Sequence, residues 1–120
     1  MVRVEADPAK NLLTIVFTGT VVAVEVQSHL VEVETLSKTL HSGFRLLTDL
    51  RGLESMELGS SPHIEQTMDL LGKAGISKVV RLIPDPSKDI GLKIMSLFHY
   101  PRKVQIVTCE TLEEAMRALG

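Results

Sequence analysis

The sequence predicts an α/β domain in which an N-terminal β-hairpin precedes βαβ-type repeats, with a mixed central sheet of about five strands and about four helices. Three observations predict this fold: an alternating start followed by a turn and a second apolar run, three later short apolar runs, and a helix-start signal after each of them. Short buried strands that alternate with helices are typical of a parallel sheet with right-handed crossovers. The hairpin is therefore expected to add an antiparallel edge.

The hairpin is predicted from the first seventeen residues. Apolar and charged residues alternate over residues 2–6, and a second apolar run extends from Leu12 to Phe17. The segment between them contains Pro8 and Asn11, which are common in turns. Two β-rich runs around such a turn predict an antiparallel pair of strands.

Residues 20–40 are predicted to form a helix, because its core-facing positions recur at three- and four-residue steps. That stripe consists of Val22, Val26, Leu30, Val33, Ser37 and Leu40. The β-branched residues of segment 21–26 suit a strand equally well, so its start is left open between helix and strand. Gly43 is expected to end the helix near the position of a left-handed cap.

Three strand–helix pairs are predicted from the rest of the chain, with strands at 44–50, 78–83 and 103–109. Ser61-Pro62 is expected to supply the N-cap and the first-turn proline of a helix that ends at Gly72 or Gly75. The next helix is expected to start at Asp85-Pro86 or Ser87 and to end before Pro101. Thr111 and Glu114 form a capping box for the last one. The predicted inward residues are Ile64, Met68 and Leu71, then Ile90, Ile94, Leu97 and Phe98, then Leu112, Ala115, Met116 and Leu119.

Length and composition bound the class of protein. The 120 residues fit one domain, residues 1–120. A net charge of −2 and 3% aromatic residues argue against nucleic-acid binding and against a platform for stacked bases or sugars. No apolar stretch approaches the roughly 20 residues that span a bilayer, and the N-terminus lacks the apolar run of a signal peptide. Because the lone Cys109 cannot form an internal disulfide, we expect a cytoplasmic protein.

Patterns for catalysis, metal binding and nucleotide binding are missing from the sequence. The histidines are not spaced as metal ligands, and His63-x-Glu65 lacks the paired cysteines of a zinc deaminase. Cys109 precedes a helix start, where a dipole lowers a thiol pKa, although a small buried strand-end residue is the favoured interpretation. No orienting partner is visible for the carboxylates of Asp49, Glu54, Glu57 and Asp69. We therefore expect no metal, no cofactor and no enzymatic activity.

The segment from Asp49 to Pro62 joins the end of a central strand to a helix N-terminus. Such junctions are where open α/β sheets place ligands and partners. Backbone N–H groups and the helix dipole there favour an anion or a phosphorylated hydroxyl, and Ser60, Ser61 and His63 supply polar groups. Simple capping by Ser61 also explains the Ser-Pro pair.

The predicted helix from Ile90 to Tyr100 carries a broad apolar arc of roughly 160°, wider than the stripe that covers one face of a sheet. Residues 88–103 contain four basic residues and one acidic residue, a net charge of +3. A basic and broadly apolar helix docks a partner or contacts an anionic membrane. Burial of both sides in a small core fits the pattern equally well.

The order of these elements, with DLRGLESMELGS after the first central strand and TLEEAMRALG at the end, resembles the STAS-like domain family, of the sulfate transporter and anti-sigma factor antagonist type. That family typically has Asp-Leu, an apolar position and then Asp-Ser-Ser/Ala-Gly, whose first serine is phosphorylated in anti-sigma factor antagonists. Here Asp49-Leu50 matches, Met56 takes the apolar position and Glu57 replaces the aspartate. Leu58 stands at the phosphoserine position and cannot accept phosphate, so Ser60 or Ser61 would have to substitute for it.

The resemblance, which spans nearly the whole chain, implies a non-enzymatic regulatory domain that binds a protein such as a regulatory kinase or a sigma-factor regulator, or a small ligand. We predict a recognition surface in the segment 56–63, formed by Glu57, Leu58, Ser60, Ser61 and His63. The alternative is an apolar-ligand or membrane-surface site on the amphipathic helix at 88–100, with Leu92 and Met95. Homodimerisation through the hairpin or this helix is a further prediction.

Overall fold

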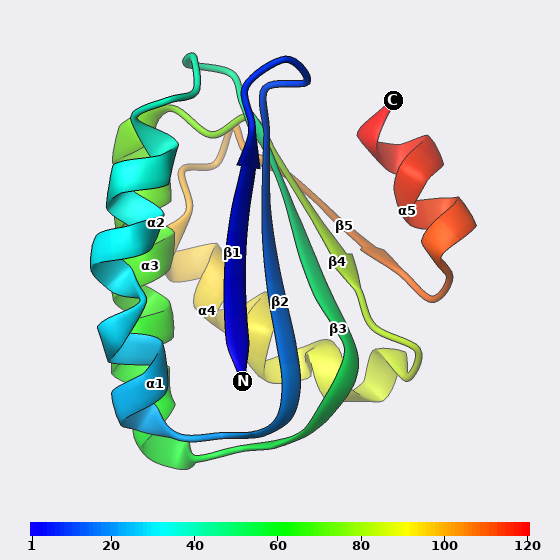
Figure 1. Cartoon of the computed structure of the whole chain (residues 1–120). Coiled ribbons are helices and arrows are strands. Elements are labelled where there is room, and N and C mark those ends of the chain that lie inside the picture. Colours follow the sequence, from blue (N-terminus) through cyan, green and yellow to red (C-terminus); the bar gives the residue numbers. More distant parts are fainter.

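A mixed five-stranded sheet forms the centre of the molecule in the computed structural model, which describes residues 1–120 apart from the side chains of Pro86, Ser87 and Ile90. The strands lie side by side in chain order (Figure 1). They are β1 (Val2–Asp7), β2 (Leu12–Val21), β3 (Arg45–Met56), β4 (Lys78–Leu82) and β5 (Gln105–Cys109). Strands β1 and β2 are antiparallel and every later pair is parallel, so the predicted hairpin at the edge of a parallel sheet is confirmed.

Helices cover both faces of this sheet. The helical elements are α1 (Ala23–Ser28), α2 (Leu30–Ser37), the 3₁₀ turn η1 (Leu58–Ser60), α3 (Ser61–Ala74), the 3₁₀ turn η2 (Pro86–Asp89), α4 (Ile90–His99) and α5 (Leu112–Leu119). Helices α1 to α4 lie on one face and α5 alone lies on the other (Figure 1). Since only His29 separates α1 from α2, the chain has four helical segments and the predicted mixed α/β fold is confirmed.

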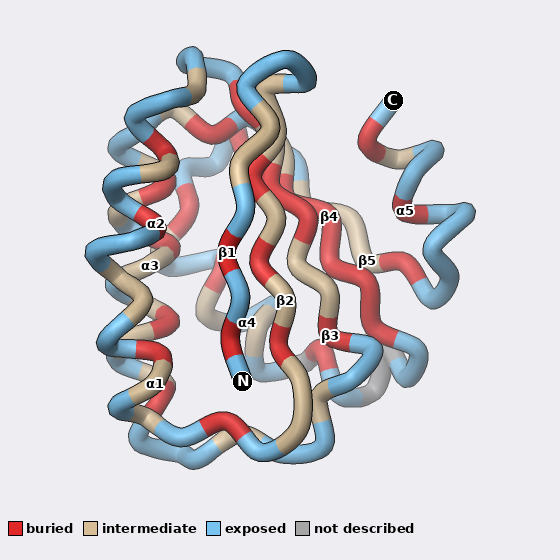
Figure 2. The backbone as a smooth tube through the Cα atoms, in the orientation of Figure 1, coloured by how far each residue is buried: buried red, intermediate tan, exposed pale blue. Residues whose placement is uncertain are grey.

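The buried residues form two clusters, one on each side of the sheet. The larger lies between the sheet and α1 to α4, and the smaller lies under α5, where Ala115 and Leu119 are buried. In Figure 2 the buried positions run along the strands and along the sheet-facing sides of the helices. The main core is therefore on the face that also carries the predicted recognition segment.

The first crossover differs from its prediction at both ends. Strand β2 continues to Val21 and α1 begins at Ala23, which divides the ambiguous segment 21–26 between strand and helix. Val22 is exposed, because it lies at this junction rather than on the predicted stripe. Gly43 has a positive φ of 93°, but it lies in the loop beyond the helix, which ends at Ser37, so the predicted cap was wrong.

Strand β3 is much longer than the predicted 44–50. Its first half pairs with both β2 and β4, and its second half continues to Met56 by pairing with β2 alone. The β2–β3 register shifts between Val16 and Thr18, opposite Gly52. A Cβ at Gly52 would lie 2.9 Å from the Thr18 methyl carbon, so a larger residue there would force the Thr18 side chain to move.

Two details of the later helices also differ. The side chain of Ser61 does not cap α3, because η1 leads directly into this helix and Ser60 is its N-cap residue. Leu112 and Met116 of α5 are exposed, because a short helix over the sheet buries only a narrow stripe. The expected inward position of Ile90 lies outside the described side chains. Gly75 ends α3 and Thr111 caps α5 as predicted.

Candidate functional site

The β3–α3 connection, residues 57–60, is tied to the start of α1. The Glu57 backbone N–H donates to the Val21 carbonyl at 2.9 Å, and the Glu57 Oε1 accepts from the Ala23 N–H at 3.2 Å. The Ser60 N–H donates to the Glu57 carbonyl at 2.9 Å and closes the turn. Glu57 therefore has a structural bond to α1, and the turn that follows it is held in one shape.

Leu58 projects from this connection with 90% of its surface exposed. Glu57 is exposed too, whereas Ser61 and His63 are half-buried in the first turn of α3. His63 Nδ1 lies 3.3 Å from the Gln66 side-chain oxygen, one turn further along. Four of the five predicted recognition residues are thus exposed or half-buried, and the apolar Leu58 is among the exposed ones.

Ser60, the fifth predicted residue, does not belong to that surface. It is fully buried, and its hydroxyl has no hydrogen-bond partner among the described residues. The chain enters α3 through Ser60, which turns its side chain inward while Leu58 stays outside. Of the two serines considered as substitutes for a phosphoserine, Ser61 is therefore the accessible one.

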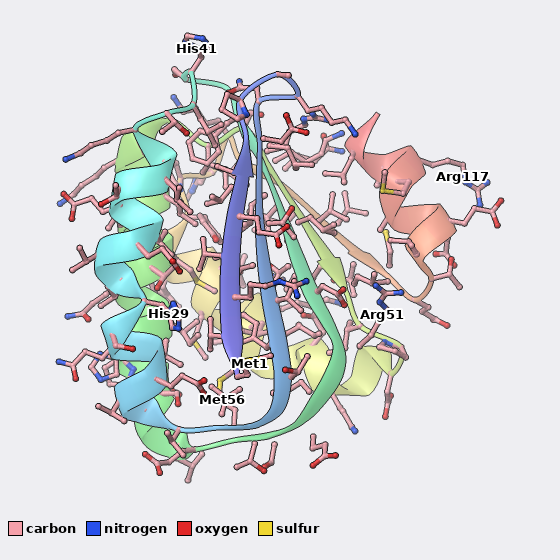
Figure 3. The ribbon with its side chains drawn as sticks, in the orientation of Figure 1. Met1, His29, His41, Arg51, Met56 and Arg117 are labelled. Atoms are coloured by element: carbon pink, nitrogen blue, oxygen red, sulfur yellow. The ribbon has the colours of Figure 1, made fainter. Side chains whose placement is uncertain are left out.

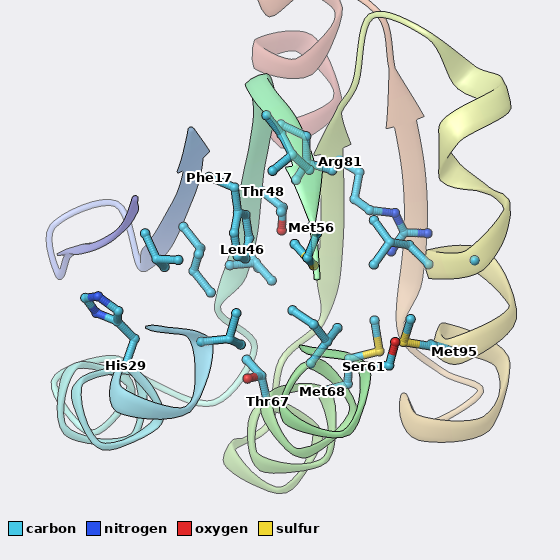
Figure 4. Close-up of a pocket in the computed structure, with 18 of the residues that line it drawn as sticks. Phe17, His29, Leu46, Thr48, Met56, Ser61, Thr67, Met68, Arg81 and Met95 are labelled. Atoms are coloured by element: carbon cyan, nitrogen blue, oxygen red, sulfur yellow. The ribbon is translucent and has the colours of Figure 1, made fainter. Parts of the chain in front are cut away.

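A cavity of about 390 Å³ lies between the sheet and the helices on the larger core face (Figure 4). Its wall is mostly apolar and comes from β1 to β4 and from α1 to α4. Leu58 and Ser61 of the predicted surface also line it. The recognition segment and the cavity are thus parts of one region.

The broad apolar arc of α4 is divided between this cavity and the outside. Leu92 and Met95 line the cavity and are half-buried. Ile94, Leu97 and Phe98 are exposed by 53%, 79% and 80%. Burial of both sides of the helix was therefore wrong, as was the inward position of Ile94, Leu97 and Phe98, because only one side of α4 faces the sheet.

A buried ion pair stands beside the cavity and was missed by the sequence analysis. The Arg81 Nε donates to Asp89 Oδ1 at 2.7 Å, and both side chains are at least 98% buried. The Arg81 Nη1 donates to the Ser96 hydroxyl at 3.0 Å, and the Thr108 hydroxyl donates to Asp89 Oδ2 at 2.6 Å. The sequence did carry a signal for this pair, because Arg81 lies inside the apolar run KVVRLI. A buried arginine needs an acidic or polar partner.

Asp49 and Asp69, two of the other candidate carboxylates, have structural partners. The Arg51 guanidinium donates to both carboxylate oxygens of Asp49 and lowers the pKa of that carboxyl. His99 joins α4 to α3, with Nδ1 2.9 Å from Asp69 Oδ1. Burial raises the pKa of the Cys109 thiol, and the nearby Glu114 carboxylate adds to this rise, so the dipole-activated alternative was wrong.

The histidines do not gather into a metal site. His29 lies between α1 and α2, and His41 lies in the loop beyond the opposite end of α2 (Figure 3). Among the described residues, no group of three His, Cys, Asp or Glu side chains is close enough to hold a metal ion. Over the same residues, no helix is long and apolar enough to cross a membrane.

Solved structures of other proteins share this architecture. The sequence matches no protein-family model and no curated protein. An uncharacterized protein of the DUF3478 family with a SpoIIAA-like fold, from Shewanella loihica, superimposes with a TM-score of 0.74 at 12% identity, over 100% of this chain and 93% of that chain. Phosphorylated SpoIIAA, a Bacillus cell fate determinant, gives 0.67 at 15% identity over 100% of both chains. An anti-sigma factor antagonist from Mycobacterium paratuberculosis gives 0.61 at 18% identity, over 99% and 92%.

These similarities define the class of the fold. The chain has the SpoIIAA-like fold, the fold of anti-sigma factor antagonists, as the STAS resemblance implied. The similarity extends over the whole chain, including the β3–α3 connection.

Proposed function

We propose that this protein is a non-enzymatic, cytoplasmic regulatory domain that binds a partner protein through Glu57, Leu58, Ser61 and His63. The observation that carries the proposal is the 90% exposure of Leu58 on a connection whose backbone is held by hydrogen bonds. A large apolar side chain presented on a rigid turn suits a protein interface, because little conformational entropy is lost when it is covered.

The chemistry at this position favours an apolar contact over a phosphate switch. The STAS resemblance aligns Leu58 with a phosphorylated serine, and a solved structure with this fold is phosphorylated SpoIIAA. A leucine has no hydroxyl, and the neighbouring Ser60 is fully buried. We therefore expect the partner to bind without phosphorylation at positions 58 and 60, which leaves Ser61 as the accessible serine of this surface.

Substitution at Leu58 tests this surface. Leu58→Asp places a charge at the centre of the proposed interface and should abolish capture of a partner, such as a regulatory kinase or a sigma-factor regulator, in pull-downs from the source cells. Leu97→Asp is the matched control, since Leu97 is a similarly exposed leucine on α4 with 79% exposure. The proposal requires a partner that wild type and Leu97→Asp retain and Leu58→Asp loses. The same partners with all three proteins would exclude the surface.

A second candidate function is contact with an anionic membrane surface through α4. The observation that favours it is the exposure of Ile94, Leu97 and Phe98 in a segment with exposed basic residues at 93, 102 and 103. Exposed apolar side chains beside basic residues bind an anionic bilayer interface. Homodimerisation would cover the same face of α4 or the free edge of β1, and light scattering measures it.

Vesicle flotation distinguishes the membrane candidate from the partner surface. We expect wild-type protein to float with anionic vesicles at low salt and to lose this association at high salt, since the electrostatic attraction is screened. Phe98→Asp should abolish flotation while Leu58→Asp leaves it unchanged. Failure of the wild-type protein to float excludes membrane contact and leaves the partner surface as proposed.

A further inference from the structure

The cavity has the size and lining of a small-molecule site. Its volume of about 390 Å³ falls in the range of roughly 300–1,000 Å³ that is usual for ligand pockets. The inner wall carries aliphatic and aromatic side chains from the strands and from α3. They include Ile15, Phe17, Leu46, Leu50, Ile64 and Met68. An extended apolar chain would contact such a wall over its whole length.

The cavity opens between the β3–α3 connection and the start of α4. Exposed residues that line a cavity mark its mouth, and here these are Glu57 and Leu58 on one side and Lys88 and Gly91 on the other. A Cβ at Gly91 would meet no atom within 4 Å. A ligand would therefore enter the cavity at this mouth.

One polar side chain in the wall is incompletely bonded. Arg81 is 2% exposed, and its side chain extends from β4 towards α4 among the lining residues (Figure 4). Asp89 and Ser96 occupy its Nε and Nη1, whereas Nη2 has no hydrogen-bond partner among the described residues. A buried donor without an acceptor is rare and unfavourable, so an acceptor oxygen beside Nη2 would be stabilised.

The charge at Arg81 indicates which kind of oxygen fits. The Asp89 carboxylate already balances the guanidinium, and both groups are out of water. A second carboxylate would leave the buried cluster with a net negative charge, which the apolar surroundings disfavour. A carbonyl oxygen accepts the same hydrogen bond and adds no net charge.

We propose that this cavity binds a single-chain amphiphile, either a long-chain alkyl ketone or a fatty acyl ester. Its carbonyl oxygen would accept a hydrogen bond from Arg81 Nη2, and its alkyl chain would lie along the apolar wall. This site lies in the interior, and its mouth borders the proposed partner surface, because Glu57 and Leu58 belong to both. Leu92 and Met95, predicted from the sequence as ligand contacts, form part of its wall.

Titration with 2-decanone, followed by NMR chemical shifts of the full-length protein, tests the site. We expect saturable one-to-one binding, with shifts at residues of β3, α3 and α4. Decanoate at pH 7.5 is the charged probe of equal chain length and should bind more weakly. Binding of neither probe, or tighter binding of decanoate, would overturn the proposal.

Arg81→Lys tests the role of Nη2. A lysine ammonium still pairs with Asp89. It lacks the planar fork that places Nη2 apart from Nε and Nη1, so we expect the fold to be kept and the hydrogen bond to the ligand to be lost. We expect about a tenfold weakening for 2-decanone, the loss of one hydrogen bond to a charged donor. Unchanged affinity would show that the carbonyl is not bound by Arg81.

Gly91→Leu tests the cavity without disturbing the ion pair. The new side chain enters open space at the mouth, and a leucine favours a helix more than a glycine does, so the variant should fold. We expect it to abolish 2-decanone binding. Lys93→Leu adds the same side chain to α4 at an exposed position that does not line the cavity and should bind as wild type does. Wild-type affinity in Gly91→Leu would place the ligand elsewhere.

Discussion

At the scale of single residues, the carboxylate that precedes the recognition segment has a structural role. Asp49 was considered from the sequence as a general acid or base, yet it accepts hydrogen bonds from the Arg51 backbone N–H and from the Arg51 guanidinium. These bonds favour the charged form, so the pKa of Asp49 lies below its ordinary value. A carboxyl with a lowered pKa is a poor proton donor at neutral pH.

Removing the Arg51 side chain should lower stability in a pH-dependent way. The lowered pKa of Asp49 contributes stability above its unfolded pKa of about 3.9, and that contribution is lost as the pH falls through the folded pKa. Since Arg51 is 46% exposed, Arg51→Leu should reduce the unfolding free energy at pH 7 by less than about 1 kcal/mol. Urea denaturation at pH 7 and near pH 3 measures this.

The difference in unfolding free energy between Arg51→Leu and wild type should be smaller near pH 3 than at pH 7. The pKa of Asp49, followed by NMR, should be higher in the variant than in wild type. Arg117→Gln, which breaks an exposed pair between Arg117 and Glu113 on α5, is the control and should leave the Asp49 pKa unchanged. An Asp49 pKa that stays low in Arg51→Leu would contradict the assignment of its cause.

At the scale of elements, the end of α3 depends on a single glycine. Gly75 has a φ of 96°, in the left-handed region, and its N–H donates to the Gly72 carbonyl at 3.2 Å. A Cβ here would lie 2.5 Å from the Ser42 hydroxyl oxygen, in the loop before β3. The residue therefore both stops α3 and permits its close contact with that loop.

Gly75→Ala should destabilise the protein by at least about 1–2 kcal/mol, because alanine disfavours the left-handed conformation and the new methyl group clashes with Ser42. Gly91→Ala is the matched control in α4, where the space is open and alanine favours the helix by about 1 kcal/mol. In chemical denaturation, the denaturant concentration at the unfolding midpoint should be lower than wild type for Gly75→Ala and no lower than wild type for Gly91→Ala. Equal midpoints would show that α3 does not need a glycine here.

At the scale of the whole molecule, the Arg81–Asp89 network holds the α4 side of the core together. Arg81 comes from β4, Asp89 from η2, Ser96 from α4 and Thr108 from β5. The η2–α4 segment is continuous, whereas β4 and β5 flank it in the chain and meet it through folding. The network therefore connects β4, β5 and the η2–α4 segment by hydrogen bonds beside the cavity.

Replacing only Asp89 should destabilise the protein far more than replacing both Arg81 and Asp89. Asp89→Leu leaves the Arg81 guanidinium buried without its counter-charge and should reduce the unfolding free energy by about 3–5 kcal/mol. Arg81→Met combined with Asp89→Leu should recover most of that loss, because no charge remains buried. A double-mutant cycle in urea measures the coupling, and additive effects of the two changes would contradict it.

Local features of the sequence determined most of the architecture. The alternation in residues 2–6, the apolar runs 78–83 and 103–109, the capping box at Thr111 and the stop at Gly75 were each read correctly. Every one depends on side-chain periodicity or on a backbone preference within a few residues, so no distant partner is needed to recognise it. The strand-to-helix junction that carries the proposed recognition surface was predicted for the same reason, since a strand end next to a helix start is a local pattern.

Contacts between distant segments decided the rest. The extension of β3 to Met56 depends on pairing with β2, and the inward turn of Ser60 beside the exposed Leu58 depends on how η1 enters α3. The division of the α4 arc into a cavity side and an outer side, and the pairing of Arg81 with Asp89, exist only once helix and sheet are packed. Periodicity determines which residues share a face of an element, whereas burial and pairing are set by what that face meets in space.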